Sequence, residues 1–307
     1  MSFNKAFQIV LMFIFTTGCS SKDHLEIKKA KVNDIEIAYY IRGDGPPLLM
    51  IMGFRGTMGI WDPQLLEILE KHYQLIVFDN RGVGLSTDTD EDHTTIPQMS
   101  DDTYHLLKTL GYDRVNVLGW SMGSMIAMHL AVTHPEIIDT LTLCSTSPGK
   151  DDVRRTTDAY AKLTTINMDR SKLLALLFPT TEDGVKASEE YVKRLTSAVI
   201  KRQVPEDLSI SSQTIERQKN GISIWFDKES NPIFDALPSL KVPTLVAGGL
   251  DDVLDQVANV QLVARKIPFC WTAYFPGAGH AFLFQDSKAL AELVTIFIET
   301  NRETKDQ

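Results

Sequence analysis

The feature that most constrains this chain is a five-residue turn between an apolar strand and a helix. Val115–Leu118 predicts a buried strand, Gly119–Gly123 reads Gly-Trp-Ser-Met-Gly, and Ser124–His134 has helical character. In a Gly-x-Ser-x-Gly turn of this kind the serine takes a strained backbone conformation, and side chains in place of the glycines would collide. The helix that follows directs its N-terminal amides and its positive dipole end at developing negative charge. The motif therefore predicts that Ser121 is a nucleophile at the end of a strand.

Short apolar runs bounded by Gly, Pro or Asp alternate with helical stretches along the rest of the chain. A hairpin is expected over Leu25–Val32 and Ile35–Ile41, with its turn at Asn33 and Asp34. The further elements expected are strands at Leu48–Met52, Leu75–Asp79, Val115–Leu118, Leu141–Cys144, Thr244–Ala247 and Trp271–Phe275, and helices near 61–72, 98–110, 122–133, 257–266 and 287–300. Near-continuous apolar strands suit a parallel sheet that is covered on both faces. The alternation therefore predicts the α/β class with a mostly parallel, doubly wound sheet.

One long stretch interrupts this alternation. From Gly149 to Pro238 there is no convincing strand, whereas Tyr191, Leu195 and Ala198 recur at helical spacing with charged residues between them. This pattern indicates a helical insertion that packs one face onto the sheet domain. The expected organisation is a first core part at 25–148, a helical cap at 149–238, a second core part at 239–301 and a tail at 302–307.

The first residues have the composition of a targeting segment. One cation, Lys5, precedes an apolar run of ten residues, Ala6–Phe15, which is shorter than the ~20 residues of a spanning helix. Small residues precede Cys19 as in a bacterial lipobox, although Thr16 stands where that motif usually has Leu, Val or Ile. We predict a signal peptide over 1–18, acylation of Cys19 and a polar tether over 19–24. The protein would then be exported and held at a membrane by its lipid; the alternative is an ordinary cleaved signal or an uncleaved anchor.

Composition narrows the class of partner. The chain has 31 basic and 40 acidic residues and a formal charge of −9, which argues against nucleic acid because duplex binding rests on clustered Lys and Arg. Hydrophobic residues make up 43% of the chain, enough for a full-sized core. Three cysteines cannot make a disulfide scaffold. We expect no cofactor and no metal, and the oligomeric state stays open.

The turn around Ser121 resembles the nucleophile elbow of the α/β-hydrolase superfamily, and the likeness extends over residues 25–300. Asp79–Ser86 matches the family's D-x-R-G-x-G-x-S turn, which we interpret as structural, with Arg81 bonding loop carbonyls. The resemblance implies an oxyanion hole formed by the backbone amides of Phe54 and Met122.

One position departs from the family pattern. Met52 stands where the family usually has His, in a strand end that reads Met-Ile-Met-Gly-Phe. A backbone amide survives any side chain, so we interpret Met52 as a feature that enlarges the apolar lining of the site.

The resemblance also implies a catalytic triad in the chain order nucleophile, acid, histidine. Of the seven histidines, His280 is the one in a loop just after the last predicted strand, where the family's catalytic histidine lies. The acid should follow the strand Thr244–Ala247, and both Asp251 and Asp252 fit the family's Gly-x-x-Asp spacing. The likeness of Asp252 and its neighbour Val253 to related hydrolases favours Asp252, with Asp251 as the alternative.

With this triad the chain is expected to be a serine hydrolase that cleaves small-molecule carboxylic esters through an acyl-enzyme. Dehalogenases and epoxide hydrolases of this fold use an aspartate nucleophile, so Ser121 disfavours them. Two alternatives stay open: a cofactor-free activity of the haloperoxidase or perhydrolase kind, and a non-catalytic surface receptor that keeps the fold without turnover.

Overall fold

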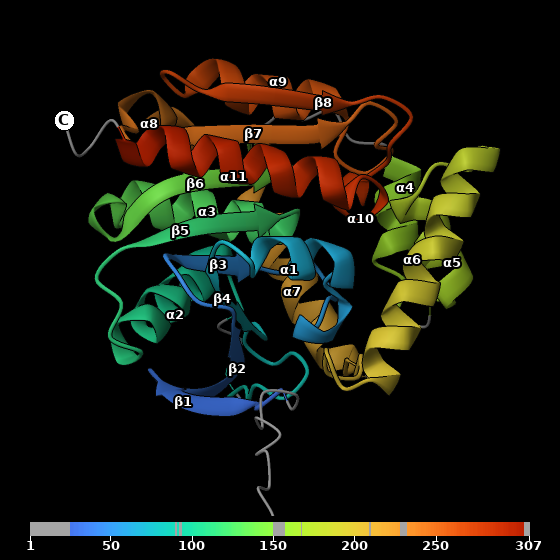
Figure 1. Cartoon of the computed structure of the whole chain (residues 1–307), viewed down its shortest axis with the longest axis horizontal. Coiled ribbons are helices and arrows are strands. Elements are labelled where there is room, and N and C mark those ends of the chain that lie inside the picture. The colour runs from blue at the N-terminus through green and yellow to red at the C-terminus, as the bar shows by residue number, and fades with distance from the viewer. Residues whose placement is uncertain are drawn as a thin grey trace, which may run out of the picture.

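The computed structural model describes residues 25–89, 91, 94–149, 157–166, 168–208, 210–227 and 232–303. Its centre is an eight-stranded sheet in the order β1-β2-β4-β3-β5-β6-β7-β8 (Figure 1). The strands are β1 (Lys28–Val32), β2 (Ile35–Arg42), β3 (Pro47–Ile51), β4 (Gln74–Phe78), β5 (Val115–Trp120), β6 (Ile138–Cys144), β7 (Thr244–Gly249) and β8 (Trp271–Phe275). The β1–β2 and β2–β4 pairs are antiparallel and the other neighbours are parallel. The predicted mostly parallel sheet is confirmed.

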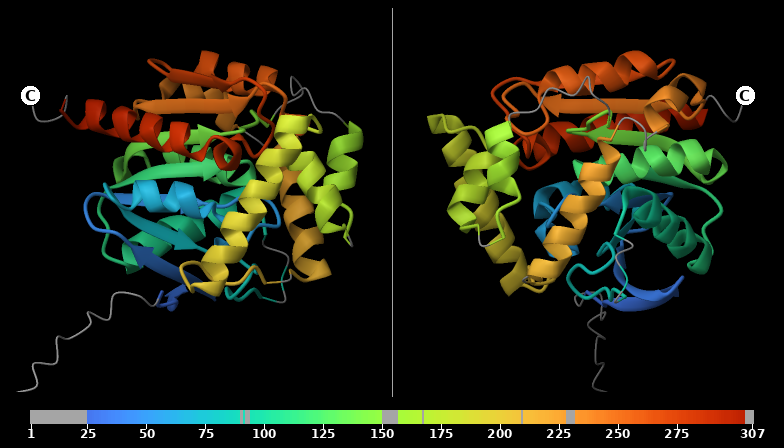
Figure 2. Two further views of the ribbon diagram at one scale, coloured as in Figure 1. Left: turned by 45° about the vertical axis from the view of Figure 1, so that its right-hand side comes forward. Right: turned by 180° about the vertical axis from the view of Figure 1, so that it is seen from behind.

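Helices cover both faces of this sheet (Figure 2). One face packs against α1 (Pro63–Leu69) and α11 (Ser287–Glu303). The other packs against α2 (Ile96–Thr109), α3 (Met122–Thr133) and α9 (Val257–Lys266). Shorter pieces are α10 (Phe282–Gln285) and the 3-10 turns Met58–Ile60, Pro135–Ile137 and Leu237–Ser239. Helix α11 continues past residue 301, where the sequence suggested that the core would end.

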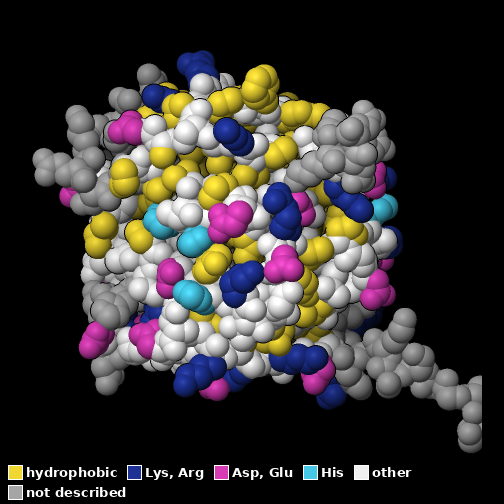
Figure 3. All heavy atoms as spheres, turned by 90° about the vertical axis from the view of Figure 1, so that its left-hand side faces the viewer, with side chains coloured by type: hydrophobic (Ala, Val, Ile, Leu, Met, Phe, Trp, Pro, Cys, Tyr) yellow, Lys and Arg dark blue, Asp and Glu magenta, His cyan; other side chains and the backbone are white. Residues whose placement is uncertain are grey.

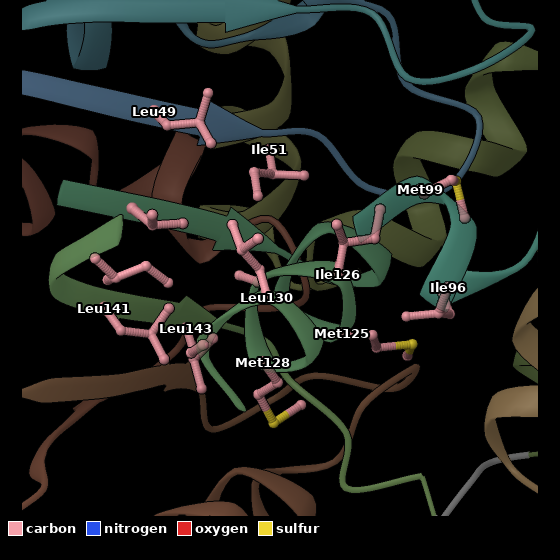
Figure 4. Close-up of a cluster of buried hydrophobic side chains, with 14 of the residues drawn as sticks. Leu49, Ile51, Ile96, Met99, Met125, Ile126, Met128, Leu130, Leu141 and Leu143 are labelled. Atoms are coloured by element: carbon pink, nitrogen blue, oxygen red, sulfur yellow. The ribbon is translucent and has the colours of Figure 1, made fainter. Parts of the chain in front are cut away.

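The apolar strands are explained by burial on two sides. In β3, Leu49 and Ile51 enter the cluster shared with α3, which Figure 4 shows, whereas Leu48 and Met50 enter the cluster on the opposite face. Successive side chains of a strand point to opposite faces, so a strand covered on both faces is apolar along nearly its whole length. Met52, which we expected in the lining of the site, is instead fully buried in the cluster with α1 and α11.

The described part of the insertion is helical. Its helices are α4 (Thr157–Leu163), α5 (Arg170–Leu177), α6 (Glu182–Ile200), α7 (Ser212–Trp225) and α8 (Ile233–Ala236). Helices α4, α5 and α6 lie beyond the carboxyl ends of the parallel strands (Figure 1). Helix α8 packs on the sheet domain, because its Ile233 and Phe234 join the core cluster around α3, as do Ile222 and Trp225 at the end of α7. We use "cap" below for the described part of α4–α7 and its connections.

Side-chain bonds fix the cap to the sheet domain at several points. In α6, the Arg194 guanidinium lies 2.7 Å from the buried Asp62 carboxylate, and Arg194 also donates to the Phe284 carbonyl at 2.9 Å. In α7, Thr214 donates its hydroxyl to the Gly82 carbonyl at 2.9 Å. These contacts hold α6 and α7 on the core.

Arg81 differs from its sequence interpretation. Its fully buried guanidinium binds carboxylates rather than loop carbonyls, with 2.8 Å to Asp102 and 2.8 Å to Asp34. A buried positive charge requires paired negative charge, and the two carboxylates come from α2 and from the β1–β2 turn. Arg81 therefore ties three segments of the sheet domain together.

The end of the molecule opposite the cap carries charges of both signs. Figure 3 shows that face, on which acidic and basic side chains are interspersed among apolar ones. The predicted signal peptide, Cys19 and the tether lie outside the described residues. Among the helices that the structure describes, none has the length and apolar character needed to cross a membrane.

Candidate active site

Ser121 occupies the sharp turn that its motif predicted. It joins β5 to α3 with φ 55° and ψ −122°, a backbone conformation that residues other than glycine rarely adopt. A Cβ atom at Gly119 would lie 2.4 Å from the Gly123 carbonyl oxygen, and one at Gly123 would lie 2.1 Å from the Ile51 carbonyl oxygen. Both glycines are therefore required by close backbone approach, and the turn holds Ser121 at the N-terminus of α3.

His280 and Asp252 form a buried pair. The His280 Nδ1 lies 2.8 Å from Asp252 Oδ2, and the two side chains are 3% and 1% exposed. The second oxygen of Asp252 accepts from the amides of Leu254 at 2.8 Å and Asp255 at 2.9 Å. Asp251 is exposed. The structure thus brings Asp252 against the imidazole and leaves Asp251 at the surface.

The backbone of His280 is held by two donors that sequence reasoning missed. Its carbonyl oxygen accepts from Trp120 Nε1 at 3.0 Å and from Ser145 Oγ at 3.0 Å. The Trp120 indole also lies 5.6 Å from the imidazole, ring centre to ring centre. No local motif marks Ser145, because its role depends on a contact with the histidine loop, which lies 135 residues further along the chain.

Burial and charge act in opposite directions on the pKa of His280. Burial alone would lower it, but the Asp252 carboxylate and, more weakly, Asp255 raise the pKa of the imidazole above its ordinary value. A carboxylate on Nδ1 also orients the ring, so that Nε2 is free to exchange a proton with a reacting group.

Ser121 and His280 border the same two small cavities. Phe54, Met122 and Asp255 border the first, which has a volume of about 20 Å³. Trp120 borders the second, of about 40 Å³. A single water needs roughly 10–15 Å³, so the closed site has room for only a few small groups.

The cap forms the roof over these cavities. Leu163 of α4 borders both of them, and Leu173 and Leu177 of α5 border the second. These leucines pack with Leu254 and Phe54 in one apolar cluster. Leu177 is also bonded to the histidine loop, because its carbonyl accepts from the Ala281 amide at 2.8 Å. The site therefore lies between the strand ends and an apolar roof.

The proposed oxyanion donors lie beside Ser121. Met122 is the first residue of α3, where helix amides have no partner within the helix. Phe54 follows β3 and borders a cavity together with Ser121. Within the residues that the structure describes, no group of three or more His, Cys, Asp or Glu is arranged to hold a metal ion.

Comparison with known proteins agrees with this architecture. The model of the alpha/beta hydrolase fold family matches residues 46–287. A relative from Mycobacterium tuberculosis (strain H37Rv), provisionally named non-heme bromoperoxidase BpoC, is 29% identical over 261 residues, which are 83% of this chain and 95% of that protein. A relative from Caulobacter sp. (strain K31), provisionally named carbamate hydrolase RutD, is 24% identical over 83% of this chain and 91% of its own.

A solved structure has the same fold along most of the chain. It is the alpha/beta hydrolase fold protein from Chitinophaga pinensis, with a TM-score of 0.79, 26% identity, and coverage of 90% of this chain and 98% of that one. The chain belongs to the α/β-hydrolase fold family. Its relatives carry names from more than one kind of chemistry, so the family alone does not define the substrate.

Proposed function

We propose that this protein is a serine hydrolase that cleaves carboxylic esters through an acyl-enzyme intermediate. The observation that carries the proposal is the placement of Ser121, at a strained strand-to-helix turn, in the same cavities as His280, whose Nδ1 lies 2.8 Å from a buried carboxylate. Nucleophile, base and orienting acid are the three parts that acyl transfer by a serine requires.

Each residue has a defined part in the proposed reaction. Ser121 Oγ attacks the ester carbonyl while His280 Nε2 takes its proton, and the amides of Phe54 and Met122 stabilise the oxyanion. His280 then protonates the departing alcohol, which leaves the acyl group on Ser121. Water then attacks the acyl carbon while His280 takes its proton, and the bond to Ser121 breaks as His280 returns that proton to Ser121 Oγ, which releases the acid. Asp252 holds the ring and stabilises the imidazolium in both halves.

Turnover of a chain-length series of nitrophenyl esters tests this proposal. Purified protein should release nitrophenol from short-chain esters in a reaction that the Ser121→Ala variant lacks. The small cavities beside Ser121, of about 20 and 40 Å³, lead us to expect acetate and propionate to be hydrolysed faster than decanoate. A folded protein that turns over no ester would support the non-catalytic receptor instead.

The pH profile should report the raised pKa of His280. The base must be neutral to accept the serine proton, so kcat/KM is expected to rise with pH and to level off once the imidazole has lost its proton. Because the Asp252 carboxylate raises the pKa, the midpoint should lie above the ordinary value of 6.5. Measuring kcat/KM for nitrophenyl acetate from pH 5 to pH 9 checks this expectation, and a midpoint below 6 would contradict it.

A second candidate reaction differs only in the nucleophile that attacks the acyl-enzyme. If hydrogen peroxide replaces water, the same serine ester yields a peracid, and no cofactor is needed. The similarity to a protein provisionally named a bromoperoxidase favours testing this. Peracid formation from acetate and peroxide, measured beside ester hydrolysis and abolished by Ser121→Ala, would add perhydrolysis to the activities of the site.

We also propose that Cys19 carries the lipid that holds the enzyme at a membrane. The proposal rests on the apolar run and the small residues before Cys19. In cells that process lipoproteins, the wild-type protein should sediment with membranes, and Cys19→Ser should move most of it to the soluble fraction or leave it unprocessed. Equal partitioning and equal size of the two proteins would refute lipidation at this residue.

A further inference from the structure

Arg55 lies directly after the proposed oxyanion donor Phe54 and has an unusual backbone. Its φ is 62°, in the left-handed region that a residue with a side chain rarely adopts. Its amide donates to the side-chain oxygen of Gln218 in α7 at 3.0 Å, and Gln218 is fully buried. The backbone of the oxyanion loop (residues 53–57) is therefore bonded to the cap at this point.

The Arg55 side chain bonds the cap a second time. Its Nη1 donates to the carbonyls of Leu163 at 3.1 Å and Thr165 at 2.7 Å, and its Nη2 donates to Ile166 at 3.2 Å. These carbonyls follow or end α4, where helix carbonyls lack partners within the helix and where positive charge is favourable. The Arg55 guanidinium thus caps the C-terminal end of α4.

The end of α4 is also the roof of the site. Leu163, whose carbonyl accepts from Arg55, borders both cavities together with Ser121 and His280. Arg55 itself borders the second cavity. A substrate that lifts this roof must stretch the bonds between Arg55 and α4, and the same residue carries the strained backbone next to Phe54.

We propose that Arg55 is a positioning residue that couples the closure of the cap to the geometry of the oxyanion hole. The kinetic part of this inference rests on the proposed ester hydrolysis, whereas the coupling itself does not. While the Arg55 guanidinium is bonded to α4, the end of α4 stays close to Ser121 and the Phe54 amide is held in place. When these bonds are lost, α4 moves away from the strand ends and the Phe54 amide is no longer fixed. Arg55 would thereby favour small acyl groups.

Hydrogen exchange tests the coupling without using catalysis. In Arg55→Gln, amide exchange in peptides over 157–166 and 53–60 should accelerate together, each by roughly tenfold, because three charge-assisted bonds are lost. The matched control is Arg42→Gln at the end of β2, which also removes an arginine between core and cap, since Arg42 Nη1 donates to the Gln203 carbonyl at 3.1 Å. Its partner Glu70 is not fully buried, so this variant should leave both peptides within about twofold of wild type. Unchanged exchange in either peptide of Arg55→Gln overturns the coupling.

Kinetic measurements on the same variants test how the coupling affects turnover and the preference for small acyl groups. For nitrophenyl acetate, Arg55→Gln should lower kcat by roughly tenfold or more, as expected for a displaced oxyanion donor, with KM within about threefold. The ratio of kcat/KM for hexanoate to that for acetate should rise by roughly tenfold. Arg55→Gly keeps the left-handed backbone without strain and should behave like Arg55→Gln.

The outcomes separate the inference from the proposed function. If Arg55→Gly behaves like wild type, or if Arg55→Gln and Arg42→Gln change kcat and the chain-length ratio equally, the positioning role is wrong. If the wild-type protein shows no Ser121-dependent turnover, the proposed function has failed, and the exchange measurement still decides whether Arg55 couples the cap to the loop.

Discussion

Replacing Ser121 with alanine should lower kcat for nitrophenyl acetate by roughly 10⁵-fold or more, because the reaction then has no acyl-accepting oxygen. Binding should change much less, since one small side chain at a site with φ 55° and ψ −122° contributes little to the apolar surface that holds the acyl group. Initial-rate measurements with enzyme above 10 μM give the range needed to quantify so large a loss.

The stability of the variant controls for unfolding. Alanine differs from serine only by the missing hydroxyl, so the melting temperature of Ser121→Ala should stay within a few degrees of that of the wild-type protein. A correctly folded Ser121→Ala protein that kept a tenth of the wild-type kcat would show that another group carries the reaction.

The second large effect is expected at Asp252. Asp252→Asn should lower kcat by roughly 10⁴-fold, because an amide in place of the carboxylate favours the wrong tautomer of the imidazole and no longer stabilises its protonated form. The matched control is Asp251→Asn, which alters an exposed neighbour and should keep kcat within about threefold of wild type. Both variants remove one negative charge, so their comparison isolates the position of the carboxylate.

The pH profile adds a second readout. The remaining activity of Asp252→Asn should have its kcat/KM midpoint at lower pH than wild type, because the carboxylate that raises the pKa of His280 is gone. Loss of activity in Asp251→Asn with near-normal Asp252→Asn would assign the acid to Asp251 and reject the pair seen at 2.8 Å.

Local sequence was sufficient for the elbow and for the class of fold. The elbow is marked by three signals within twenty residues: the strand before Ser121, the two glycines and the helix after it. Each signal follows from the local backbone geometry of a strand, a sharp turn and a helix. The parallel sheet could be predicted in the same way, because strands buried on both faces, such as β3, are nearly continuously apolar. These features depend on neighbours in the chain.

The choice between the two adjacent aspartates could not be made by spacing alone. The double glycine at 248–249 allows two alignments, and either one places an aspartate three residues after a glycine. What distinguishes them is three-dimensional: the loop turns so that one oxygen of Asp252 takes the amides of Leu254 and Asp255 and the other faces His280. The likeness to related hydrolases favoured the residue that the structure places against the ring.

Contacts between distant segments were outside the reach of the sequence. Arg81 was expected to bond nearby carbonyls, yet its partners are the carboxylates of Asp34 and Asp102. Arg55 had no sequence signal, because its acceptors at 163–166 lie in an insertion whose position over the strand ends is set by tertiary packing. Long charged side chains choose their partners after the fold has formed, so their roles are the last to be predicted.

Covalent labelling tests the central claim most directly. Intact protein treated with a fluorophosphonate probe and digested for mass spectrometry should carry one adduct, on the peptide that contains Ser121, and the label should be absent from Ser121→Ala. The reaction needs the serine, its base and the oxyanion donors together. A folded wild-type protein that stays unlabelled, or one labelled equally in the Ser121→Ala variant, would contradict the assignment of Ser121 as the nucleophile.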